Sequence, residues 1–208
     1  MISHDKKFIL ITPPKTGSVT LSSYFLPYSD IQEIIQQKDD NFDFIDEGLI
    51  DPEFKYTYSK HNKISAYSHI NNFDEYYKIG CIRNPYDRVV SFWRWSCKVS
   101  FLNRIIYGLS LWWWLRSLKK NDWAKQTYFD YFSLNNNLIM DDYIHLESIT
   151  EDLNRICTKL DIPYKKPSLS NTTKRKCWQK YHNKRSINIT NEIFNSDFEE
   201  FGYSKILS

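Results

Sequence analysis

The sequence predicts an α/β fold, in which a single domain over residues 1–208 is built on a central, mostly parallel β-sheet with helices on both faces. At 208 residues, 41% of them hydrophobic, the chain is large enough for one sizeable core. Short apolar runs alternate with helical patterns, most clearly over 8–25, 77–93 and 143–160, and such alternation is typical of a parallel sheet. The sequence shows no internal repeat and no linker that would divide it.

The first strand–loop–helix unit, residues 8–25, reads FILITPPKTGSVTLSSYF. Its four leading residues suit a buried strand, which the two prolines end. Gly17 allows a tight turn and a close approach to a ligand, and Ser18 or Thr20 can open the helix. The N–H groups of the helix start, the hydroxyls and the ammonium of Lys15 together favour an anion. The loop is not a Walker A motif, because Lys15 precedes the only glycine.

The second unit, residues 77–93, reads YKIGCIRNPYDRVVSFW. Its apolar part predicts a buried strand, and Asn84 followed by Pro85 predicts the start of a helix. Arg83 therefore stands at the carboxyl end of a strand, the edge at which ligands bind in open α/β sheets. Helical spacing puts Ser91 on the same side, and a guanidinium together with a hydroxyl suits a phosphate.

Both loops resemble those of the sulfotransferases that use 3′-phosphoadenosine 5′-phosphosulfate (PAPS). The run Pro-Lys-Thr-Gly-Ser, residues 14–18, is similar to the loop that holds the 5′-phosphosulfate in that family. The run Arg-Asn-Pro-Tyr-Asp-Arg-Val-Val-Ser, residues 83–91, looks like its 3′-phosphate site, and is closest to the carbohydrate and heparan sulfate branch. With gaps, the resemblance covers residues 8–98 and 141–204.

The resemblance implies a P-loop-like sulfotransferase fold and transfer of the sulfonate of PAPS to a hydroxyl, with a carbohydrate expected as acceptor rather than a small phenol. The product would be adenosine 3′,5′-bisphosphate (PAP), and Lys15 would stabilise the leaving oxygen without a metal ion. Asp87 and Arg88 match family positions too, but we interpret them as an ion pair or cap that holds the helix. The implied cofactor-binding residues are Lys15, Thr16, Gly17, Ser18, Val19, Thr20, Arg83 and Ser91, joined by Lys174 and Arg175 unless these two form a solvated basic loop.

The predicted general base is His61, because an imidazole titrates near neutral pH and this one follows a strand predicted at 54–59. Its position resembles that of a histidine which serves as base in part of the family, whereas other branches use a glutamate. An exposed or capping role for His61 is the alternative. His69, Glu47 and Glu147 remain open as bases.

Apolar spacing and capping signals predict the other elements. They are a loop or short helices over the acidic residues 28–54, short helices at 62–70 and 73–77, a strand at 143–147, a capping box at 148–151, a helix ending near 160, and a last helix through 193–201 that ends at Gly202.

Residues 99–140 resemble the family least and are predicted to form a divergent, aromatic-rich helical insert. The run Leu-Trp-Trp-Trp-Leu, residues 111–115, allows three interpretations: a core helix, an aromatic platform for a sugar or lipid acceptor, or a peripheral membrane contact through Trp112–Trp114. A further aromatic helix is expected over 123–132.

Composition narrows the class of protein. A net charge of +3 is too mild to argue for a nucleic-acid partner. No apolar run reaches the roughly 18 residues of a membrane span, the amino terminus shows no signal peptide, and the four cysteines form no CxxC pair. We therefore expect buried thiols, no metal site and a cytoplasmic protein. The rival functions are a nucleotide-binding, P-loop-like kinase and a non-catalytic module that binds PAP or PAPS.

Overall fold

The computed structural model describes residues 1–30, 49–50, 57–58, 61–118, 123–168 and 176–207. The chain divides into two compact units. Unit 1 comprises residues 1–82 and 130–172, and unit 2 comprises residues 83–129 and 173–208. The single domain expected from the sequence stays a prediction.

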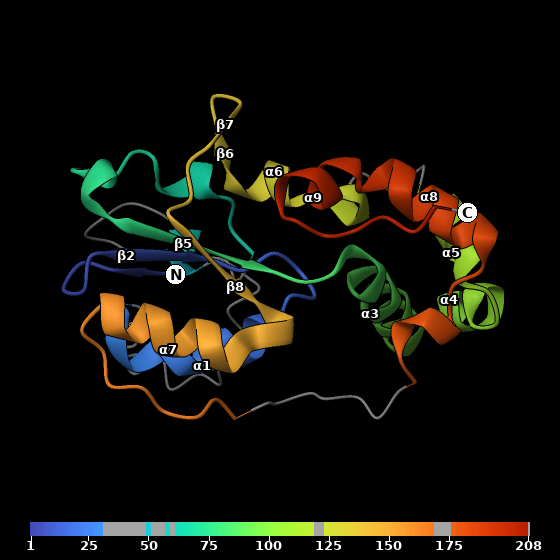
Figure 1. Ribbon diagram of the computed structural model, residues 1–208, viewed down its shortest axis with the longest axis horizontal. Helices are drawn as coiled ribbons and strands as arrows, with labels where there is room; N and C mark the ends of the chain where they lie inside the picture. The colour runs from blue at the N-terminus through green and yellow to red at the C-terminus, as the bar shows by residue number, and fades with distance from the viewer. Residues whose placement is uncertain (31–48, 51–56, 59–60, 119–122, 169–175, 208) are drawn as a thin grey trace. The chain divides into compact units, whose positions relative to one another are not determined.

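Unit 1 is built on a four-stranded sheet with the order β1-β2-β5-β8 (Figure 1). β2 (Phe8–Ile11) and β8 (Asp142–His145) pair in parallel with β5 (Tyr77–Ile82), which lies between them. β1 (Ile2–Ser3) adds to β2 in the antiparallel direction. The mostly parallel sheet is therefore confirmed, and the carboxyl ends of its three parallel strands meet at one edge, where ligands of open α/β sheets bind.

Two helices cover one face of this sheet, α1 (Ser18–Phe25) and α7 (Ile149–Lys159), both on the lower side in Figure 1. Their apolar side chains pack against alternate residues of the strands, because successive side chains of a strand point to opposite faces of the sheet. The shared core includes Leu21, Phe25, Leu153 and Ile156 of the helices and Phe8, Leu10, Ile79, Cys81 and Ile144 of the strands. The apolar helix face predicted after residue 148 is thus confirmed.

The other face of the sheet is covered differently from the α-helical layer that the sequence predicts. In Figure 1 the 3-10 helix η3 (Ile64–Tyr67) lies above the sheet, where the sequence predicts a short helix over 62–70. A second 3-10 turn, η4 (Phe73–Glu75), stands in place of the helix predicted at 73–77. A Cβ at Gly80 of β5 would meet Tyr143 at 2.9 Å and Phe132 at 3.0 Å, so the rings of these two residues cover this side of the strand.

Of three sequence expectations in unit 1, one is confirmed in its described part and two are corrected. Of the strand predicted at 54–59, the described part is β4 (Thr57–Tyr58), which forms as a strand and pairs with β3 (Leu49–Ile50) in a separate two-stranded sheet. The strand expected at 143–147 is β8, which ends at His145. The predicted capping box does not form, because the hydroxyl of Ser148 donates to Asp152 (3.1 Å). A small hairpin of β6 (Ser133–Leu134) and β7 (Asn137–Leu138) completes the strands.

The regular elements described in unit 2 are all helices. Unit 2 contains α3 (Pro85–Val99), α4 (Phe101–Tyr107), α5 (Leu111–Ser117), η8 (Trp178–Lys180), α8 (Lys184–Ile193) and α9 (Asn195–Glu200). Its core is rich in aromatic side chains, including Tyr86, Phe92, Trp114, Phe194 and Phe198. Within the range 99–140, predicted as an aromatic-rich helical insert, α4 and α5 are helical as expected, whereas residues 133–138 form the β6–β7 hairpin of unit 1. That this range is an insert stays a prediction.

Two long helices predicted in this region are each broken in two. The helix expected over 123–132 forms as η6 (Trp123–Lys125) and α6 (Tyr128–Phe132), because Arg88 takes the carbonyl of Gln126. The last helix divides at Phe194, whose φ of −108° and ψ of 32° end α8 before α9 begins. Gly202, with φ 72°, follows α9 as predicted for a helix end.

All four cysteines lie in the described part of the chain, and none forms a disulfide. Cys81 and Cys157 are buried, as predicted. Among the described residues, no group of three or more His, Cys, Asp or Glu side chains is placed to hold a metal ion.

Candidate functional site

The loop that follows β2 has a path fixed by two buried hydrogen bonds. The hydroxyl of Thr16 donates to the carbonyl of Pro13 (2.7 Å), and the thiol of Cys81, near the end of β5, donates to the carbonyl of Thr16 (2.8 Å). Lys15 and Gly17 both take positive φ angles, of 70° and 89°. Such left-handed turns direct backbone N–H groups into a concavity that suits an anion.

Gly17 is the position at which this loop requires a glycine. Besides its positive φ, a Cβ at Gly17 would lie 2.7 Å from Cδ1 of Leu146, which follows β8. Gly17 is also the N-cap of α1, and the first N–H groups of a helix have no acceptor inside it. The turn therefore leads directly into the positive end of a helix, which favours an anion.

The predicted loop residues differ in exposure. Lys15, Gly17 and Val19 are half-buried, whereas Thr16, Ser18 and Thr20 are buried. Because the hydroxyl of Thr16 donates its hydrogen bond to the carbonyl of Pro13, the side chain of Thr16 stabilises the path of the loop.

His61 is attached to the start of this loop. Its Nδ1 lies 2.8 Å from the carbonyl oxygen of Thr12, the first residue after β2. Because a carbonyl only accepts, Nδ1 carries the hydrogen, and the neutral imidazole keeps its lone pair on Nε2. This hydrogen bond fixes the tautomer and anchors the ring at the start of the loop.

The other candidate bases are placed differently. His69 and Glu147 are exposed, and Glu47 lies outside the described residues. Lys174 and Arg175 lie outside the described residues as well, so their predicted part in phosphate binding is untested.

In unit 2, Arg83 follows β5 directly and forms an ion pair with Asp87, one turn into α3. Nε and Nη2 of Arg83 donate to Oδ2 of Asp87 at 2.8 and 2.5 Å, and the two side chains are 12% and 19% exposed. Asn84 caps α3 by accepting the N–H of Tyr86 (3.0 Å), and Pro85 is the first helical residue, as predicted. The sequence thus places a guanidinium of fixed orientation at the start of a helix.

The backbone of Arg83 is clamped by Tyr128. The N–H of Arg83 donates to the phenolic oxygen (2.9 Å), and the phenolic O–H donates to the carbonyl of Arg83 (2.7 Å). Asp197 of α9 in turn accepts the N–H of Tyr128 (2.6 Å) and pairs with Arg88 (3.2 Å). Asp197 is completely buried and Arg88 is 3% exposed, so this is a core ion pair, and the structural interpretation of Asp87 and Arg88 is confirmed.

Sequence reasoning missed Tyr128 and the role of Asp197 in this clamp. Tyr128 lies in the region that resembles the family least, and no local motif indicates its contact. Ser91 is half-buried on α3, and its predicted proximity to Arg83 is untested.

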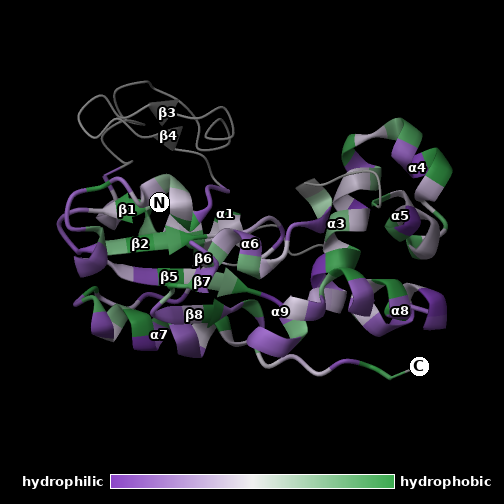
Figure 2. Ribbon diagram, turned by 90° about the horizontal axis from the view of Figure 1, so that it is seen from above, coloured by the Kyte–Doolittle hydropathy of each residue, from purple (hydrophilic) through white to green (hydrophobic). Residues whose placement is uncertain are grey.

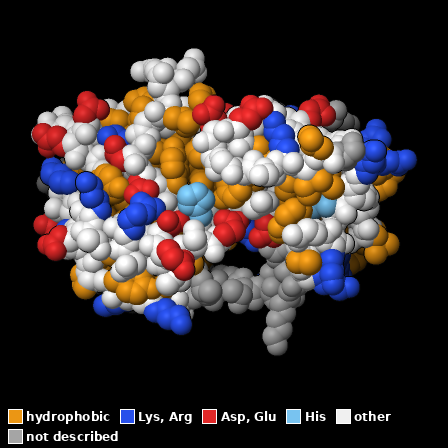
Figure 3. Space-filling view, in the orientation of Figure 1, with side chains coloured by type: hydrophobic (Ala, Val, Ile, Leu, Met, Phe, Trp, Pro, Cys, Tyr) orange, Lys and Arg blue, Asp and Glu red, His pale blue; other side chains and the backbone are white. Residues whose placement is uncertain are grey.

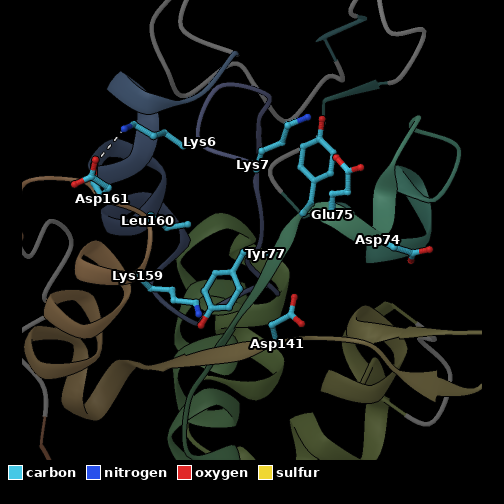
Figure 4. A pocket seen from close by; sticks show the side chains of 10 residues that line it. Lys6, Lys7, Asp74, Glu75, Tyr77, Asp141, Lys159, Leu160 and Asp161 are labelled. Carbon is cyan, nitrogen blue, oxygen red and sulfur yellow. Dashed lines mark hydrogen bonds between the residues drawn. The ribbon is translucent and has the colours of Figure 1, made fainter.

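A separate pocket of about 430 Å³ lies in unit 1 at the other end of the strands (Figure 4). Its lining contains side chains of both charge signs, among them the basic Lys7 and Lys159 and the acidic Glu75 and Asp141. The backbone there belongs to the amino-terminal ends of β2 and β5, whereas the Lys15 loop follows the carboxyl end of β2. This pocket is therefore distinct from the candidate anion site.

The fold and the loop define a class, that of α/β proteins with a loop suited to an anion at the carboxyl edge of a parallel sheet. The sequence model of the sulfotransferase family matches residues 1–204, and the chain belongs to that family. No curated protein and no solved structure matches the chain. Family membership makes this protein a transferase of sulfonate groups.

Proposed function

We propose that this protein transfers the sulfonate group of PAPS to a hydroxyl of a carbohydrate and releases PAP. PAPS is the donor typical of the sulfotransferase family, to which the chain belongs. The carbohydrate acceptor rests on the likeness of residues 83–91 to the carbohydrate branch.

The residues of the Lys15 loop fit the 5′-phosphosulfate of this donor. Gly17 allows the left-handed turn of the loop, the start of α1 supplies N–H groups, and Lys15 supplies a point charge. The Arg83 fork, followed by Ser91 on α3, suits the 3′-phosphate that distinguishes PAPS from ATP. PAPS brings an activated sulfonate, and the chain has to supply only a base and charge stabilisation.

The proposed transfer is a single in-line displacement. His61 accepts the proton of the acceptor hydroxyl at Nε2 while the acceptor oxygen forms its bond to sulfur. The bond between sulfur and the 5′-phosphate oxygen breaks, and Lys15 stabilises the negative charge that develops on this oxygen. The sulfate ester, PAP and protonated His61 account for all atoms and charge.

The hydrogen bond between His61 and Thr12 is the observation that carries the catalytic assignment. It holds an imidazole at the start of the loop that bears Lys15. A module that only binds nucleotides has no use for a base in that position.

The test is transfer of labelled sulfonate from PAPS to an array of glycans and phenols. We expect Lys15→Ala, Arg83→Ala and His61→Ala to abolish or strongly reduce transfer while circular dichroism shows a retained fold. Lys6→Ala, at the opposite end of β2, is the matched control and should keep wild-type turnover. Loss of transfer in His69→Ala but not in His61→Ala would assign the base to His69.

Nucleotide binding separates the rival functions. Calorimetry should show PAP binding more tightly than ATP, and the reverse order would favour a kinase. Tight PAP binding without transfer to any acceptor would indicate a non-catalytic module. Wild-type turnover in Lys15→Ala or Arg83→Ala would overturn the assignment of the two anion sites.

A further inference from the structure

The helix α4 turns its apolar side to solvent, the reverse of an ordinary amphipathic helix. Phe101, Leu102, Ile105 and Ile106 are 68%, 66%, 64% and 54% exposed, and Leu109 beyond the helix is 101% exposed. Their spacing forms one stripe, which a water-soluble helix normally buries in a core. With Val99, which is 60% exposed, these residues form what we call the α4 face. A continuous exposed apolar surface of this kind marks an interaction site.

The outward orientation of the α4 face is fixed by contacts on the opposite, polar side of the helix. The side chain of Asn103 donates to the hydroxyl of Ser96 (2.8 Å), and the indole N–H of Trp93 donates to the carbonyl of Tyr107 (2.9 Å). The hydroxyl of Ser100 caps α4. Because these groups tie α4 to α3, the apolar stripe is left pointing away from unit 2. Figure 2 shows the hydrophobic residues of α4.

The surroundings of the α4 face are basic. Residues 89–118 contain four Arg or Lys residues and no Asp or Glu. Arg94, Lys98, Arg104 and Arg116 of this segment are exposed. The guanidinium of Arg104 lies 5.3 Å from the ring centre of Phe101, and that of Arg116 lies 5.6 Å from the ring centre of Trp113. In Figure 3, hydrophobic and basic side chains adjoin over this part of unit 2.

We propose that the α4 face binds the surface of an anionic lipid bilayer. Aliphatic side chains would enter the boundary between headgroups and acyl chains, and the neighbouring cations would contact anionic headgroups. Trp95 and Trp113, 41% and 54% exposed, are suited to the same interface. None of the described helices is long and apolar enough to cross a membrane, so the contact is peripheral.

Charge and chemistry disfavour other occupants. Two copies of this chain would bring two basic surfaces together, which costs free energy. Leucine and isoleucine side chains offer no hydrogen bonds to the hydroxyls of a glycan. A bilayer with anionic lipids satisfies both the aliphatic stripe and the cations around it.

This inference revises the membrane contact predicted for Trp112–Trp114. Trp114 is 4% exposed and lies in the core of unit 2 with Leu111 and Leu115, so the core-helix interpretation holds for that side of α5. Trp113 alone of the three indoles is largely exposed, and the principal contact moves to α4.

Cosedimentation of the full chain with vesicles tests the proposal. Vesicles of phosphatidylcholine with phosphatidylserine should bind the protein, and vesicles of phosphatidylcholine alone should bind it far less. Ile105→Ser/Ile106→Ser should weaken binding by about tenfold or more, because each buried CH₂ contributes about 0.8 kcal/mol. Lys98→Glu/Arg104→Glu should weaken it similarly, since each cation contributes about 1 kcal/mol. Leu207→Ser, at an exposed leucine in the carboxyl-terminal segment, is the matched control and should bind as the wild type does.

Three results would overturn the proposal. They are failure to bind either vesicle, binding that Ile105→Ser/Ile106→Ser leaves unchanged, and light scattering that shows a dimer which this double variant dissolves. Because all these residues are exposed, the variants should keep the wild-type melting temperature. Sulfonate transfer is not part of the readout, so the result is independent of the proposed function.

Discussion

Arg83 and Asp87 form a monodentate ion pair, in which one carboxylate oxygen accepts hydrogen bonds from both Nε and Nη2 of the guanidinium at 2.8 and 2.5 Å. The pair has two effects on an anion. Asp87 fixes the orientation of the fork, and its negative charge repels a phosphate that approaches the same fork.

Asp87→Asn separates these two effects, because asparagine keeps an acceptor and removes the charge. We expect PAP to bind more tightly to this variant by on the order of 1 kcal/mol, about fivefold. The unfolding free energy should fall by about 0.3–1 kcal/mol, because a carboxylate in the first turn stabilises a helix. Calorimetry and urea unfolding measure the two quantities. Weaker binding in Asp87→Asn would show that orientation dominates over repulsion.

Tyr128→Phe tests the clamp on the backbone of Arg83. The variant loses both hydrogen bonds of the phenol, at 2.9 and 2.7 Å, and leaves the polar groups of Arg83 unsatisfied. We expect a loss of about 1–3 kcal/mol of stability and a raised KM for PAPS with a smaller change in kcat.

The matched control is Tyr24→Phe, because the phenol of Tyr24 also makes two contacts, with Sγ of Cys157 (3.2 Å) and the N–H of Lys165 (2.9 Å). It should lose comparable stability and keep the KM for PAPS. Equal KM values in wild type and Tyr128→Phe would refute the positioning role and leave a structural one.

The burial of His182 predicts how stability depends on pH. Burial lowers the pKa of His182, while the carbonyl of Tyr86, 3.1 Å from Nε2, and the charge of Asp87 oppose this shift. Below the ordinary histidine pKa of about 6.5, the unfolded chain binds a proton that the folded chain does not. This contribution to stability is therefore complete above about pH 7 and is lost as the pH falls toward the lowered pKa.

Urea unfolding between about pH 7.5 and pH 5.5 checks this sign. The unfolding free energy should decrease with falling pH in the wild type, and the slope should be smaller in His182→Gln. His69→Gln, at an exposed histidine, should leave the slope as it is. A His182→Gln slope equal to that of the wild type would assign the pH dependence to other groups.

Local signals were enough to predict the two strand–loop–helix units. The first unit forms as its own residues specify, with a strand at 8–11, a turn at Gly17 and a helix at 18–25. The same holds for Asn84 and Pro85 at the start of α3. These features depend on neighbours within one or two turns, so they are written in short stretches of sequence.

The contacts that hold Arg83 depend on residues far away along the chain. Tyr128 is 45 residues from Arg83, and Asp197 is 109 residues from Arg88. Such pairs follow from tertiary packing, which no local pattern encodes. The apolar stripe of α4 has the same character, because spacing predicts a stripe and leaves open whether it faces the core or solvent.

Gly17→Ala tests the loop on which the proposed donor site depends. An alanine there has to adopt φ 89°, which costs about 1–2 kcal/mol, and its Cβ would come 2.7 Å from Cδ1 of Leu146. Gly202→Ala is the matched control, because Gly202 has φ 72° and no atom within 4 Å of the added Cβ. Both variants should lose stability through the backbone, and Gly17→Ala should lose more.

The two variants should differ most in nucleotide binding. Gly17→Ala displaces the backbone between Lys15 and the start of α1, so we expect its affinity for PAP to fall by at least about tenfold, because the displaced N–H groups no longer converge on the phosphate. Gly202→Ala, at the end of α9, should bind PAP as the wild type does. Unchanged affinity in Gly17→Ala would mean that the nucleotide does not contact this loop, and would remove the physical basis for placing the phosphosulfate beside Lys15.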